Sequence, residues 1–78
     1  MPTLLRINGY RVVIYPADHE PMHVHVINAG GEAVIEIGQE ARLIRSGGMK
    51  EKVIQEARVI VQDNAAMLAE AWEEIHGE

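Results

Sequence analysis

The sequence contains no cysteine. Without cysteine the fold has no disulfide, and a metal site would have no thiolate ligand. The chain also lacks an apolar run approaching the roughly 20 residues that span a bilayer. Its first residues show no basic flank followed by a long apolar region, as a secretory signal would. These absences predict a cytoplasmic protein with no membrane segment.

Positive charge is scarce in the last third of the chain. The net charge is −5, and residues 53–78 carry six acidic side chains and one basic one, whereas residues 1–52 carry six of each. Affinity for nucleic acid rests largely on neutralising phosphates. The charge balance therefore argues against nucleic acid as a partner for this chain alone.

The length and the residue pattern predict one α+β domain over residues 1–78. Alternating apolar and β-branched residues predict an antiparallel sheet of about four strands, most simply a meander. The strands are expected at residues 3–8, 10–15, 22–28 and 32–37. Residues 41–45 fit either a short fifth strand or a connector.

From Met49 to Ile75 the chain has neither proline nor glycine. Apolar residues recur there at spacings of three and four, which predicts one long C-terminal helix over residues 49–76, about 40 Å in length. Asn64 interrupts the apolar stripe. It fits two interpretations equally: an asparagine that sets the register of a helix pair, or simply a kink or an amide bonded within the monomer. Trp72 is expected to be a core anchor.

Strand alternation divides the side chains of the predicted sheet between two faces. The apolar face, on which the helix should pack, carries Leu5, Ile7, Val12, Ile14, Val24, Val26, Ile35 and Ile37. The polar face carries Arg6, Arg11, Val13, Tyr15, His23, His25, Glu32, Val34 and Glu36.

Three of the four histidines, His19, His23 and His25, fall within seven residues. Residues two apart in a strand point to the same face, so His23 and His25 should stand side by side. A hairpin with Ala29-Gly30 as its two-residue loop places His23 opposite Glu36. A carboxylate at that position would favour the charged imidazolium of His23.

Several short motifs occur together in this chain. They are the opening Met-Pro-Thr, Arg-Ile-x-Gly-Tyr-Arg, a proline turn before His23-Val24-His25-Val26, Gly-Gly-Glu-Ala, and Glu70-Ala71-Trp72-x-x-Ile75-His76-Gly77. Together they resemble a small bacterial family known as domain of unknown function 4160. That family usually has a second proline where this chain has Met22, and often a helix-capping serine where it has Met49.

The resemblance implies a compact β-meander with a C-terminal helix. It also implies a genomic setting beside a second small family, domain of unknown function 2442, which is often described as toxin–antitoxin-like. It implies no established biochemical activity.

The histidines suggest two kinds of chemistry. His19, His23 and His25 are candidate ligands for a divalent transition metal, because imidazole with carboxylate suits zinc, iron or nickel. The alternative is that His23 and His25 are hydrogen-bonded strand residues without a metal. A metal-independent ribonuclease would need a general acid, a general base and a cation. The candidate catalytic residues for that activity are His23, His25, Glu36, Arg11 and Tyr15.

The leading functional hypothesis is nevertheless a non-enzymatic module for protein interaction, either toxin–antitoxin-like or regulatory, whose partner is a small protein from a neighbouring gene. A homodimer is expected as well. A helix of about 40 Å would overhang strands of about 20 Å and leave Leu68, Trp72 and Ile75 to be covered.

Overall fold

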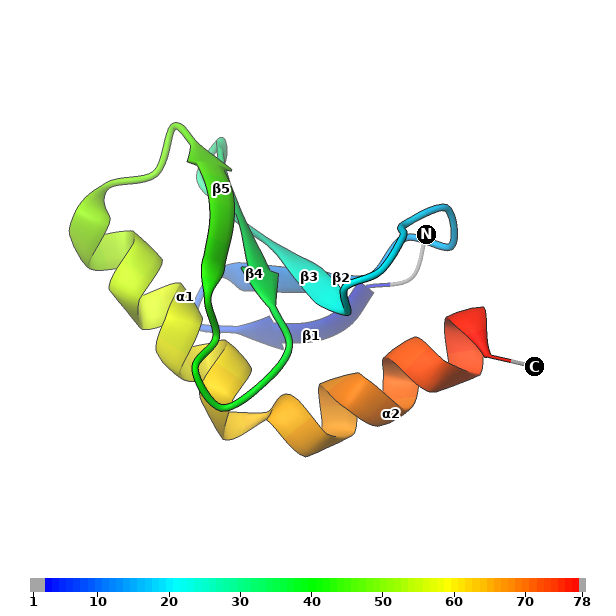
Figure 1. Cartoon of the computed structure of the whole chain (residues 1–78). Helices are drawn as coiled ribbons and strands as arrows, with labels where there is room; N and C mark the ends of the chain where they lie inside the picture. Colours follow the sequence, from blue (N-terminus) through cyan, green and yellow to red (C-terminus); the bar gives the residue numbers. More distant parts are fainter. Residues whose placement is uncertain (1–2, 78) are drawn as a thin grey trace.

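The computed structural model describes residues 3–77 as a five-stranded antiparallel sheet with two helices (Figure 1). The elements are β1 (Thr3–Ile7), β2 (Tyr10–Val13), β3 (His23–Asn28), β4 (Gly31–Glu36), β5 (Leu43–Gly47), α1 (Glu51–Asp63) and α2 (Ala65–His76). The strands are neighbours in chain order, which confirms the α+β class and the meander. Residues 1–2 and 78 of the predicted domain lie outside the described residues. Neither described helix is long and apolar enough to cross a membrane.

The fifth strand resolves an alternative that the sequence left open. It occupies Leu43–Gly47, slightly later than the range 41–45, and pairs with β4 through an irregularity between Val34 and Ile35. The sheet therefore has one strand more than the predicted four.

Left-handed backbone conformations close the hairpin between β3 and β4. Ala29 and Gly30 have φ angles of 48° and 85°. Two consecutive residues with positive φ are typical of the type I′ turn, whose twist suits a two-residue hairpin. The register follows from this loop, with His23 opposite Glu36 as predicted.

The core lies between the apolar face of the sheet and the two helices. It contains the predicted strand residues Val12, Ile14, Val24, Val26, Ile35 and Ile37, together with Ala57, Val61, Leu68 and Trp72 from the helices. Trp72 is 2% exposed, which confirms it as a core anchor. The polar face is also partly covered, since Val13, His25 and Val34 are buried.

The prediction of one long helix is wrong, because the chain leaves helical geometry at Asn64 (φ −119°, ψ 19°). The Asn64 side chain donates from Nδ2 to the Ile60 carbonyl at 2.8 Å. The amide is therefore bonded within the monomer at a kink, which is one of the two interpretations of Asn64. The bend turns α2 back along the sheet (Figure 1) and buries Leu68 and Trp72.

The bend also removes the argument that led to the homodimer. Leu68 is completely buried and Ile75 is partly buried against the same core, so both are covered by their own chain. The expected overhang of the helix is wrong. The homodimer itself stays a prediction, without that support.

Candidate functional site

Strand β3 places His23 and His25 side by side, and the loop before it folds Asp18 against them. Asp18 Oδ2 lies 3.2 Å from His25 Nε2 and 3.5 Å from His23 Nε2. The three residues each offer one ligand atom, and these atoms lie within 4.8 Å of one another. His25 is buried, and the other two are half-buried. We call these three residues the Asp18 cluster.

A tight turn after β2 holds the Asp18 carboxylate in place. The Tyr15 backbone amide donates to Asp18 Oδ2 at 3.1 Å, and the Asp18 amide donates back to the Tyr15 carbonyl at 3.0 Å. Burial raises the pKa of the Asp18 carboxyl. The bond from Tyr15 and the charges of His25 and His23 outweigh burial, so this pKa lies below its ordinary value. Asp18 is therefore an ionised carboxylate at neutral pH and can offer an oxygen atom as a metal ligand.

The Nδ1 atoms of both histidines are held by acceptors outside the cluster. His23 Nδ1 lies 2.8 Å from the Pro21 carbonyl oxygen, and His25 Nδ1 lies 2.7 Å from Glu32 Oε2. These oxygens only accept, so each Nδ1 carries the hydrogen and donates. Asp18 Oδ2 also only accepts, so a hydrogen on His25 Nε2 donates to it at 3.2 Å. Each Nε2 atom faces Asp18 and becomes a metal ligand only when it carries no hydrogen. Metal-ligating histidines are usually held from behind in this way.

Aromatic rings connect the Asp18 cluster to the end of α2. The Tyr15 and His25 centroids lie 4.7 Å apart, and those of His25 and His23 lie 5.3 Å apart. His23 lies 5.4 Å from Trp72, which stacks on His76 at 3.8 Å. His76 Nδ1 and Nε2 lie 3.2 Å from the Trp72 and Tyr15 carbonyl oxygens. The ring contacts thus run from the segment after β2 across β3 to the last turn of α2.

The structure brings together only part of the predicted catalytic set. His23, His25 and Tyr15 are in ring contact. Arg11 lies opposite Ile27, two residues along β3 from His25. The Arg11 backbone therefore lies one row farther along the polar face than His25.

Glu36 lies opposite His23 in the register, but its carboxylate has another partner. Glu36 Oε1 accepts from Arg42 Nε at 2.9 Å. Among the described ion pairs, the acid beside His23 is Asp18. The residue opposite His23 was thus predicted correctly, whereas the expected carboxylate partner was not.

His19 is exposed and does not belong to the Asp18 cluster. Asp18 takes the place that the metal-site prediction gave to His19. The predicted sites did not include Asp18, whose signal in the sequence was an acidic side chain in the turn that leads into the His-x-His strand. Glu32 had a stronger signal, because the predicted register makes it a diagonal neighbour of His25.

Comparisons with known proteins place the chain in a family without revealing an activity. A family model described as Domain of unknown function (DUF4160) matches residues 9–73, which include the whole Asp18 cluster and Trp72. No curated protein and no solved structure matches the chain. Since the match covers most of the chain, the protein belongs to the DUF4160 family.

Proposed function

We propose that this protein binds a divalent transition metal through Asp18, His23 and His25. The observation that supports the proposal is the convergence of three ligand atoms within 4.8 Å, with the Nδ1 atom of each imidazole held from behind. Two histidines and one carboxylate suit zinc or iron(II) and leave coordination positions open for water or substrate.

The spacing of the donor atoms fits such an ion. Bonds of about 2.0–2.1 Å in tetrahedral geometry put neighbouring ligand atoms about 3.3 Å apart. Asp18 Oδ2 already lies 3.2 Å and 3.5 Å from the two Nε2 atoms. The two Nε2 atoms lie within 4.8 Å of each other, and any excess over about 3.3 Å would be closed by rotation of the imidazole side chains when an ion binds.

The same arrangement gives less support to a His-dependent ribonuclease. Both imidazoles lie close to a single carboxylate, that of Asp18, and the carboxylate proposed for that activity, Glu36, is bound by Arg42. We therefore prefer metal binding. An ion with open positions would polarise an oxygen ligand and so supply hydrolytic chemistry.

The chain contains one tryptophan, which makes metal binding directly measurable. The His23 ring lies 5.4 Å from Trp72, so a paramagnetic ion such as Co²⁺ or Cu²⁺ at the cluster is expected to quench the fluorescence of Trp72. Calorimetry with Zn²⁺ should give one ion per chain.

His23→Ala and His25→Ala should abolish both signals, whereas His19→Ala is the matched control and should retain them. Loss of binding in His19→Ala, or the absence of one-to-one binding in the unmodified protein, would contradict this site.

A cytoplasmic interaction module of toxin–antitoxin type is the second candidate. It is favoured by the two large hydrophobic side chains that the described chain exposes, Val59 at 51% and Met67 at 39%, on neighbouring acidic helices. The partner would be the small protein of a neighbouring gene or a second copy of this chain. Co-expression with affinity purification and light scattering test these partners. A complex disrupted by Val59→Ser and Met67→Ser supports the module, and a lone monomer in both experiments contradicts it.

A further inference from the structure

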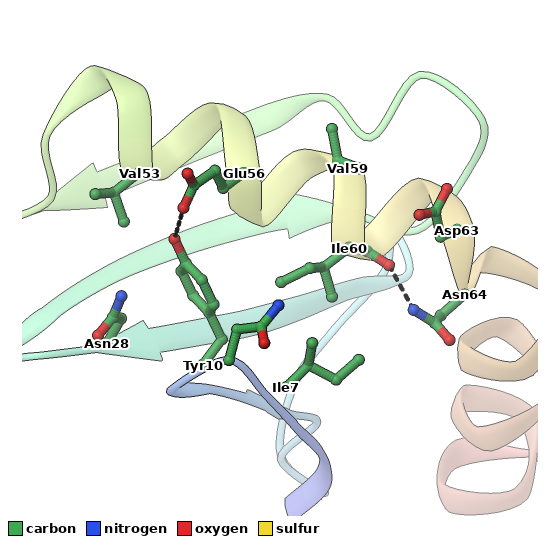
Figure 2. Close-up of a pocket in the computed structure, with 10 residues that line it drawn as sticks. Ile7, Tyr10, Asn28, Val53, Glu56, Val59, Ile60, Asp63 and Asn64 are labelled. Carbon is green, nitrogen blue, oxygen red and sulfur yellow. Dashed lines mark hydrogen bonds between the residues drawn. The ribbon is translucent and has the colours of Figure 1, made fainter.

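A groove runs between α1 and the turn that joins β1 to β2 (Figure 2). Its cavity has a volume of about 690 Å³, which lies within the range of small-molecule sites. None of the residues of the Asp18 cluster lines it. The groove is therefore a separate feature of the molecule, and the metal proposal assigns it no role.

Apolar side chains form the walls of this groove. Ile7 comes from the end of β1, and Val53 and Ile60 come from α1. All three are only half-buried, so they keep apolar surface in contact with water. Figure 2 shows Ile7 and Ile60 in the space between the sheet and α1. A hydrocarbon body placed there would remove this surface from water, which favours binding.

Among the described residues that line the groove, the charged side chains are Glu56 and Asp63, both acidic. Glu56 is held in a defined position, because the Tyr10 hydroxyl donates to its Oε1 atom at 2.6 Å. Tyr10 is itself 4% exposed, so the phenol that holds the carboxylate is anchored in the core. The groove therefore presents an oriented negative charge beside an apolar wall.

We propose that the groove binds an organic ammonium ion, a primary amine with an alkyl or aryl body. The charged head pairs with the Glu56 carboxylate, and the body packs against Ile7, Val53 and Ile60. Glu56 and Asp63 repel ligands that carry a carboxylate or phosphate, so the site discriminates by charge as well as by shape. Because no metal ligand takes part, this site is tested independently of metal binding.

Three probes with the same six-carbon body test the proposal: n-hexylammonium, hexan-1-ol and hexanoate. Each is titrated into ¹⁵N-labelled protein at constant ionic strength, and backbone amide shifts are followed by NMR. Hexylammonium should shift the amides around Tyr10, Glu56 and Ile60 in a saturable manner. Hexan-1-ol should bind about fivefold more weakly, the upper end for an exposed ion pair. Hexanoate should not bind.

Glu56→Gln is the decisive variant, and Glu70→Gln on an exposed position of α2 is its matched control for the same change of charge. Glu56→Gln should lower the affinity for hexylammonium to that for hexan-1-ol. Glu70→Gln should leave the affinity for hexylammonium unchanged. Tyr10→Phe, which releases Glu56, should have a smaller effect in the same direction. The amide spectrum of each variant reports whether it is folded.

Three results would overturn the proposal. The first is equal affinity for hexylammonium and hexan-1-ol. The second is an undiminished affinity for hexylammonium in Glu56→Gln. The third is a shift of the groove amides on dilution of the protein alone, which would identify the groove as an interface between copies of the chain.

Discussion

Glu32 holds the ring of His25 from behind, with Oε2 2.7 Å from Nδ1. A carboxylate in this position orients a metal-ligating imidazole and increases its basicity, and losing such a partner typically costs about 10–100-fold in metal affinity. Glu32→Gln is therefore expected to weaken Zn²⁺ binding by at least about tenfold, with one ion still bound per chain. Competition against a chromophoric chelator measures this affinity.

Glu36→Gln is the control for that experiment. Glu36 lies on the same strand and face, but its carboxylate is bound by Arg42. The same loss of charge there should leave Zn²⁺ affinity nearly unchanged. Equal losses in the two variants would mean that only net charge matters, and the assigned role of Glu32 would be wrong.

The Tyr10 hydroxyl should ionise at a higher pH than that of an ordinary tyrosine. The hydrogen bond to Glu56, burial and the charge of Glu56 raise its pKa above 10.0, against a smaller opposing effect of Asn28. Because the folded pKa is raised, the stabilisation is complete below the unfolded pKa and is lost as the pH rises through the folded value. The tyrosinate absorbance of the protein minus that of Tyr10→Phe should have its midpoint above 10.0, and Glu56→Gln should lower that midpoint. A midpoint at or below 10.0 would contradict the contact.

At the scale of the elements, the hairpin of β3 and β4 packs tightly on the turn before α1. A Cβ atom at Gly31 would lie 2.5 Å from the Gly48 carbonyl oxygen, which is backbone and cannot rotate away. Gly31→Ala should therefore reduce the free energy of unfolding by about 1–3 kcal/mol, the usual range for overpacking. Gly38→Ala meets nothing within 4 Å and should change it by less than about 0.5 kcal/mol. Urea denaturation measures the free energy of unfolding of both variants. Equal losses in Gly31→Ala and Gly38→Ala would show that the close approach of Gly31 to Gly48 does not cause the destabilisation.

The junction between α1 and α2 is determined more by the core than by Asn64. Asn64→Ala removes the bond to the Ile60 carbonyl and should cost about 1 kcal/mol in thermal or urea unfolding. The bend should nevertheless persist, because burying Leu68 alone contributes about 1.5–3 kcal/mol. Residual dipolar couplings measure the angle between the helices. Gln55→Ala on an exposed position of α1 is the control, and a continuous helix in Asn64→Ala would refute this account.

At the scale of the whole molecule, His76 joins the end of α2 to the segment that follows β2. Its Nε2 atom lies 3.2 Å from the carbonyl oxygen of Tyr15, 61 residues earlier in the chain. Its Nδ1 atom faces the Trp72 carbonyl, so a neutral ring donates to one of these oxygens and a protonated ring to both. The contact closes the molecule beside the Asp18 cluster.

His76→Ala should therefore lower the free energy of unfolding by about 1 kcal/mol. It should also speed amide exchange in the last turn of α2 and make Trp72 fluorescence easier to quench with iodide. Glu74→Ala, at an exposed position in the same turn, should do neither. The same response in both variants would mean that His76 does not anchor the helix.

Several features followed from the sequence because their causes are local. Alternation along each strand assigned Val24 and Val26 to the core and His23 and His25 to the other face, and the structure agrees. The Ala29-Gly30 loop determined the register, since a two-residue hairpin leaves one pairing. The same alternation placed Glu32 on the face that carries His25.

Other features were decided only when distant segments met. The sequence indicated that the helix could break at Asn64 but not whether it does, because the packing of Leu68 and Trp72 in the core of the sheet and helices forms only in the folded chain. A turn residue becomes a candidate ligand only when its loop folds back on β3, as Asp18 does. Likewise, the folded chain pairs Glu36 with Arg42, and the carboxylate that lies beside His23 is that of Asp18. Sequence periodicity assigns a side chain to a face of the sheet. Its interaction partner depends on the length of the side chain and on which charged groups the folded chain brings close to it.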